Sequence, residues 1–128
     1  MEYTNLEIEV IKLLLNINNE KFNILKEQFL HSKVKTRDIT QVWFFTNISI
    51  GDSIKSLPQP IDERIVLSDV WARINWKDDI GFFLFIEKGY ISMLEWFTYW
   101  DTLYNPNFKE YKVFYEWDNR DIPNELLD

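Results

Sequence analysis

The amino-acid sequence predicts an α+β fold, in which an N-terminal αα-hairpin packs on an antiparallel β-meander of about five strands. Two observations support this prediction. Apolar residues recur at helical spacing over residues 1–31, and over residues 33–117 the spacing changes to the alternation that is typical of strands. Because a helical hairpin cannot bury its apolar stripe alone, we expect it to cover one face of the sheet.

Residues 1–31 are predicted to form two helices joined by an Asn-rich turn. Thr4 followed by Glu7 is the capping-box pattern that begins a helix, and Asn19 is a typical N-cap for the second helix. The apolar stripes are expected to comprise Leu6, Val10, Leu13, Leu14 and Ile17 in the first helix and Phe22, Leu25 and Phe29 in the second. Glu7, Glu9 and Lys12 are expected off the stripe.

Residues 33–50 predict one long strand that is bent near residues 38–41. Phe44, Thr46, Ile48 and Ile50 fall on one face of it, and Trp43 and Phe45 fall on the other. Lys33, Lys35 and Arg37 alternate along its first part and form the only basic cluster. A phosphate backbone or an acidic partner is one target for this cluster. We favour the alternative, an edge strand on which charge prevents edge-to-edge pairing.

A hairpin over residues 80–99 is the most distinct element of the predicted sheet. Its first strand is apolar on both faces, and Lys88-Gly89 is a two-residue turn in which the glycine supplies a positive φ. Such a turn places Glu95 opposite Phe82. It also puts Trp96 on the same face as Phe83, Phe85 and Trp100. Strands are predicted over residues 64–74 and 111–117, and residues 118–128 are predicted to be a loose acidic tail.

Composition narrows the class of protein. A chain of 128 residues is expected to form a single domain, residues 1–128. It contains no cysteine, which excludes disulfides and thiolate chemistry and fits a cytoplasmic location. The net charge of −7 disfavours binding to nucleic acid or to an anionic membrane. We find no pattern of a signal peptide or a transmembrane helix.

Few residues are arranged for catalysis, metal binding or cofactor binding. The single histidine, His31, has no nucleophile in a recognisable motif beside it, and we expect it to be an exposed residue at the end of a helix. Three scattered glycines cannot form a phosphate-binding loop. The paired carboxylates match no metal-binding loop, so we expect no metal and no cofactor.

Glu95 is the most informative carboxylate because it alternates with Met93 and Phe97 in an aromatic strand. One interpretation is a general acid or base in an aromatic pocket, with a second carboxylate from Asp69 or Asp101. The other, which we favour, is a structural acceptor that binds backbone amides of a loop or pairs with an arginine such as Arg64 or Arg73.

Most of the 22 aromatic rings are expected in the core. The sheet face away from the helices must be covered by a loop, by the chain's own strands or by another molecule, and an exposed aromatic patch there would mark a binding site. We expect Trp100, Tyr104 and Trp117 to be the exposed ones, since they lie in or near loops and the last strand. Tryptophan and tyrosine are favoured at the energetic centre of protein interfaces.

Two stretches resemble a group of small bacterial proteins of unassigned function. Residues 81–99, which read GFFLFIEKGYISMLEWFTY, are similar to the group's "GFLLF…G…LEGYTY" stretch, and residues 37–46 are similar to its "R-E-x-T-G-x-G-F-F-T" stretch. The resemblance implies the fold and a bacterial origin. The acidic net charge and the aromatic rings expected at the surface favour a non-enzymatic protein-binding module, for example an immunity-type inhibitor of a basic partner. The alternatives are a small hydrolase or ligand-binding domain that uses Glu95, and self-association through an aromatic face.

Overall fold

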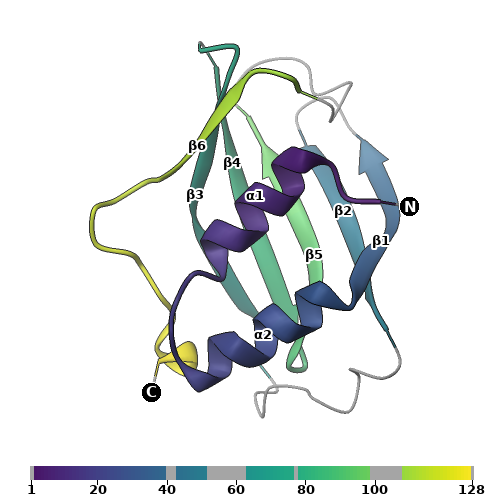
Figure 1. Cartoon of the computed structure of the whole chain (residues 1–128), viewed down its shortest axis with the longest axis vertical. Coiled ribbons are helices and arrows are strands. Elements are labelled where there is room, and N and C mark those ends of the chain that lie inside the picture. The colour runs from purple at the N-terminus through teal and green to yellow at the C-terminus, as the bar shows by residue number, and fades with distance from the viewer. Residues whose placement is uncertain (1, 40–42, 52–62, 77, 99–107, 128) are drawn as a thin grey trace.

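The computed structural model describes residues 2–39, 43–51, 63–76, 78–98 and 108–127, and within them two helices cover one face of a six-stranded antiparallel sheet (Figure 1). The helices are α1 (Asn5–Leu14) and α2 (Glu20–Leu30), and a short 3-10 helix, η1, spans Asn124–Leu126. The strands are β1 (Ser32–Ile39), β2 (Trp43–Ile50), β3 (Ile65–Ile74), β4 (Asp78–Glu87), β5 (Tyr90–Phe97) and β6 (Tyr111–Tyr115). The α+β class and the helical hairpin are therefore as predicted.

The strand order is β1-β2-β5-β4-β3-β6, which differs from a meander. The predicted single bent strand is two antiparallel strands, because β1 folds back on β2 and pairs Ile39 with Phe44. Because the predicted strand is two strands, the sheet has six strands rather than about five. β2 then pairs with β5 rather than β3, and β6 returns to the outer edge of β3. β1 and β6 are thus the edge strands, which confirms the edge position predicted for Lys33 and Lys35.

Both helix starts are as the capping patterns predicted. Thr4 and Glu7 form a reciprocal capping box, and the Asn19 side chain accepts a hydrogen bond from the Phe22 amide at 2.8 Å. Buried residues of α1 and α2 pack against the inward side chains of β2, β3, β4 and β5. No helix in the described residues is long and apolar enough to cross a membrane.

The register of the β4–β5 hairpin differs from the predicted one because β5 contains a β-bulge. The turn has the positive φ expected at Gly89, and Lys88 also has a positive φ. Ile86 faces Ile91, as predicted. The register then shifts, so that Phe85 faces Met93 and Phe83 faces Glu95. A one-residue shift moves a strand's side chains to the opposite face. Trp96 is therefore fully buried beneath the helices, opposite Phe82, and does not share a face with Phe83 and Phe85.

The C-terminal residues form specific contacts, so the prediction of a loose tail was wrong for its described part. Arg120 makes a bidentate ion pair with Asp69 on β3, with both N–O distances at 2.8 Å. It also donates to the Leu14 carbonyl oxygen at the end of α1. Leu126 is fully buried, and its carbonyl oxygen accepts a hydrogen bond from the Asn19 side chain.

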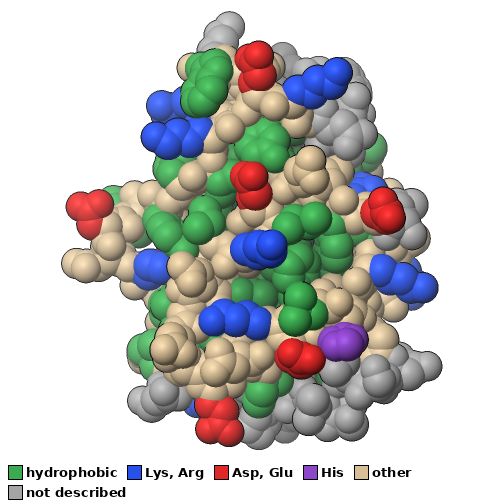
Figure 2. All heavy atoms as spheres, in the orientation of Figure 1, with side chains coloured by type: hydrophobic (Ala, Val, Ile, Leu, Met, Phe, Trp, Pro, Cys, Tyr) green, Lys and Arg blue, Asp and Glu red, His purple; other side chains and the backbone are tan. Residues whose placement is uncertain are grey.

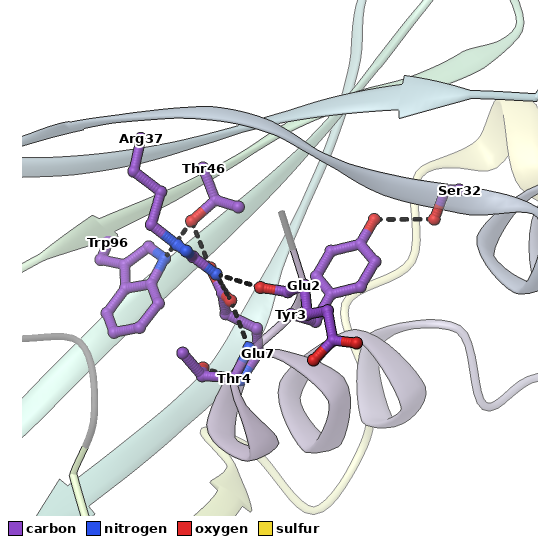
Figure 3. Close-up of polar contacts among 8 residues, drawn as sticks. All are labelled: Glu2, Tyr3, Thr4, Glu7, Ser32, Arg37, Thr46 and Trp96. Carbon is purple, nitrogen blue, oxygen red and sulfur yellow. Dashed lines mark hydrogen bonds and ion pairs between the residues drawn. The ribbon is translucent and has the colours of Figure 1, made fainter.

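A buried polar network joins the start of α1 to the sheet (Figure 3). Glu7 is fully buried, although it was expected off the apolar stripe. Its carboxylate accepts from the backbone amide of Thr4, from the Arg37 guanidinium and from the Thr46 hydroxyl. The Trp96 indole N–H donates to Thr46 Oγ1 at 3.2 Å, which closes the network. A bulge in β1 between Val34 and Thr36 turns Arg37 inward, away from the face that Lys33 and Lys35 were expected to share with it.

Candidate interaction surface

The sheet face opposite the helices carries a row of aromatic side chains. In the sheet register, Trp43 on β2 lies opposite Phe97 on β5, and Trp71 on β3 lies opposite Phe114 on β6. Gly81 on β4 lies between Phe97 and Trp71 and completes the row across five strands. We call Trp43, Phe97, Trp71 and Phe114 the aromatic row. Trp43 is the most exposed of the four, at 40%.

Gly81 makes room for the Phe97 ring in the row. The Phe97 ring lies over the Gly81 backbone, and a Cβ atom added at Gly81 would lie 2.3 Å from the ring. In the space of the missing side chain, Phe97 makes an edge contact with Trp71 at a centroid distance of 5.2 Å. It also stacks on Phe83 at 4.7 Å, with an interplanar angle of 18°. Glycine inside a strand often marks such a close approach.

Glu95 lies beside this row, between Phe45 and Phe83. Both rings are its direct cross-strand neighbours, from β2 and β4 respectively. The arginines named for it in the sequence pair elsewhere, Arg64 with Glu87 at 3.1 Å and Arg73 with Asp79 at 2.9 Å. Among the described residues, Glu95 has no hydrogen bond and no ion pair. The structural interpretation favoured from the sequence therefore finds no support in this part of the chain.

Partial burial among aromatic rings raises the pKa of the Glu95 carboxyl above its ordinary value, and the positive charge of Arg64 opposes that shift. A raised carboxyl pKa means that the folded protein binds more protons than the unfolded chain between the unfolded and folded pKa values. The ionised carboxylate therefore lowers the free energy of unfolding above the folded pKa. This cost disappears as the pH falls below the unfolded pKa.

We expect Glu95→Gln to raise the melting temperature at pH 7, because it removes a partly desolvated charge. The gain should shrink as the pH falls and vanish below about pH 4, where the carboxyl is protonated in both states. Thermal unfolding of both proteins between pH 3 and pH 8 measures this. A difference in melting temperature that is independent of pH would show that the effect does not arise from ionisation of Glu95.

A hollow of about 340 Å³ lies at the end of the aromatic row, lined by Trp71, Phe114, Asp79 and Glu116. The Trp71 Nε1 atom is buried and has no hydrogen-bond partner in the described part of the chain. The Arg73 guanidinium lies 5.8 Å from the centre of the Phe114 ring and pairs with Asp79 at the rim. The hollow thus combines aromatic walls with carboxylates.

The other residues predicted for the surface have mixed outcomes. Trp100 and Tyr104 lie outside the described residues. Trp117 follows β6 and is exposed at 60%, as expected. Asp69, named as a second catalytic carboxylate, is buried in its ion pair with Arg120, and Asp101 lies outside the described residues. His31 ends α2, is exposed and pairs with Glu27 at 3.2 Å.

The helix-covered side of the molecule has a different surface. Figure 2 shows that acidic and basic side chains are interspersed there, with smaller areas of hydrophobic surface between them. Among the described residues, no group of three or more His, Asp or Glu side chains is arranged to hold a metal ion. We take the aromatic row as the candidate binding surface of the described residues.

Sequence reasoning identified Trp43 and Phe45 as sharing a face but missed Trp71, Phe97 and Phe114. Their signal is alternation, since each is flanked by residues that turn inward. The strand order was needed to bring them into one row. Comparison with known proteins adds no assignment: no family model, no curated protein and no solved structure matches this chain.

Proposed function

We propose that the protein is a non-enzymatic protein-binding module whose partner docks on the aromatic row and Glu95. The observation that supports this best is the row itself, four large rings aligned across five strands on the face that the helices leave uncovered. Partly exposed aromatic rings add apolar area to an interface, and they lose little conformational entropy on binding because they have only two side-chain torsions. We include Trp117 in this surface because it is exposed at 60% just after the end of β6, the edge strand at which the row ends.

The charge of the molecule favours a basic partner. A net charge of −7 accelerates association with a cationic protein and repels anionic ones. Glu95 and Glu116 place carboxylates beside the aromatic row. An immunity-type inhibitor of a basic protein, acting in the bacterial cytoplasm, is the form of this function that we propose.

The hydrolase alternative has one observation in its favour, the raised pKa of Glu95. A hydrolase site is expected to contain a second catalytic group within reach of the reacting atoms. Of the two carboxylates considered for that role, Asp69 is buried in its ion pair with Arg120, and Asp101 lies outside the described residues. We therefore prefer the binding function.

Matched tryptophan substitutions test the proposed surface. Immobilised wild-type protein and the variants Trp43→Ser, Trp117→Ser and Trp76→Ser are incubated with lysate of the source organism, and bound proteins are quantified by mass spectrometry. Trp76 lies in the β3–β4 turn and is exposed at 64%, so it controls for the loss of an exposed indole. We expect a basic protein whose recovery falls at least about tenfold with Trp43→Ser and Trp117→Ser and is unchanged with Trp76→Ser.

Two results would contradict the proposal. One is a captured protein that binds wild type and Trp43→Ser equally. The other is light scattering that finds a wild-type dimer and a Trp43→Ser monomer, because the aromatic row would then serve self-association.

A further inference from the structure

On the sheet face opposite the helices, each arginine lies over an aromatic ring and forms an ion pair with a carboxylate. The Arg64 guanidinium lies 4.1 Å from the centre of the Phe85 ring and pairs with Glu87. Arg73 repeats the arrangement with Phe114 and Asp79, at a longer ring distance of 5.8 Å. A guanidinium is stabilised by both groups, since the ring face attracts the cation and the carboxylate accepts two of its N–H groups.

In the part of the chain that the structure describes, Glu95, Phe45 and Phe83 present the same two chemical groups with no cation between them. The carboxylate lies between two rings on neighbouring strands, and within the described residues no arginine or lysine pairs with it. Arg64 acts on Glu95 only through its longer-range charge, because its ion pair is with Glu87. The carboxylate is half-buried, so its interaction with a cation is screened less than that of a fully exposed group.

We propose that Glu95, flanked by Phe45 and Phe83, binds an arginine side chain of the partner protein. This inference rests on the proposed function and adds the chemistry that the surface recognises. Arginine fits better than lysine, because a planar guanidinium stacks on aromatic rings and pairs with both carboxylate oxygens. The overall charge of −7 favours the approach of such a cationic group.

A pair of small probes tests the site without knowledge of the partner. N-acetyl-arginine amide carries the guanidinium, and N-acetyl-citrulline amide has nearly the same shape without the charge. Each is titrated into the wild-type protein while the Glu95 carboxyl carbon and the ring protons of Phe45 and Phe83 are followed by NMR. We expect saturable shifts of these resonances with the arginine probe, and binding at least about fivefold weaker with the citrulline probe.

Two variants of equal charge separate a specific site from general attraction to an acidic protein. Glu95→Gln removes the proposed carboxylate, and Glu110→Gln removes the same charge from an exposed position just before β6. We expect Glu95→Gln to weaken binding of the arginine probe at least about fivefold and Glu110→Gln to change it less than twofold. Glu95→Gln retains the fold, because glutamine replaces a carboxylate that forms no hydrogen bond in the described residues.

Equal binding of the two probes, or equal binding of the arginine probe to wild type and Glu95→Gln, would overturn the inference. Failure of the inference is distinguishable from failure of the proposed function. A partner that is lost with Trp43→Ser but retained with Glu95→Gln would leave the docking surface in place and remove only the arginine site.

Discussion

Replacing Arg37 with methionine is expected to lower the free energy of unfolding by about 3 kcal/mol, because it leaves the carboxylate of Glu7 buried without its counter-charge. Glu7 is fully buried, and the Arg37 side chain, exposed at 15%, donates to both of its oxygens. Thr4 and Thr46 still donate to the carboxylate in the variant, but neither supplies a positive charge. Chemical denaturation at pH 7 measures the loss.

Two further variants identify the cause of that loss. Lys35→Met removes a charge from the same edge strand at an exposed position, and we expect a change within about 0.5 kcal/mol. The double variant Glu7→Gln, Arg37→Met removes both charges, so it should be more stable than Arg37→Met alone. If Arg37→Met costs no more than Lys35→Met, the buried carboxylate does not depend on its ion pair.

The local signals in the sequence predicted local structure well. The capping box at Thr4, the N-cap at Asn19 and the turn at Gly89 all involve residues within a few positions of each other, so a single pattern specifies each one. The inward face of β2 followed from alternation for the same reason. Strand order depends on pairing between distant segments, such as β2 with β5, and no local pattern encodes it.

Two bulges account for the errors in side-chain direction. An extra residue in β1 turns Arg37 towards Glu7, and a register shift in β5 turns Trp96 inward and Glu95 outward. The second had a signal, since Leu94 and Trp96 are apolar and flank the charged Glu95, an alternation that favours the core for the two apolar residues. Glu7 had one too, because it precedes Val10, Ile11 and Leu14 by three, four and seven positions and so lies on the buried face.

The candidate surface was only partly predictable for a related reason. Glu95 and Trp43 stand out by residue type, but the row also needs Gly81, whose missing side chain makes room for the Phe97 ring. That role becomes visible only when the register sets Gly81 between Phe97 and Trp71. The alternation within each strand therefore predicts which face carries aromatic rings. It does not predict that the rings of different strands lie side by side.

Replacing Arg120 with methionine is expected to destabilise the protein by about 3 kcal/mol and to release the C-terminal residues from the sheet. Asp69, exposed at 2%, would lose both of its hydrogen bonds from Arg120, and the Leu14 carbonyl oxygen would lose a donor. Chemical denaturation measures the stability. Limited proteolysis with chymotrypsin, which cleaves after aromatic and leucine residues, measures the release.

Arg120 connects the C-terminal segment to the end of α1, and no pattern in the sequence predicts that these two regions are in contact. We expect Asp121→Asn, an exposed neighbour, to leave both measurements unchanged. Adding Asp69→Asn to Arg120→Met should recover part of the stability, because a neutral amide is less costly to bury than a carboxylate. The double variant should be cleaved as fast as Arg120→Met, because the ion pair that holds the C-terminal segment is still absent. Cleavage that is as slow in Arg120→Met as in wild type would show that Leu126 and its contacts with Asn19 hold the segment without Arg120.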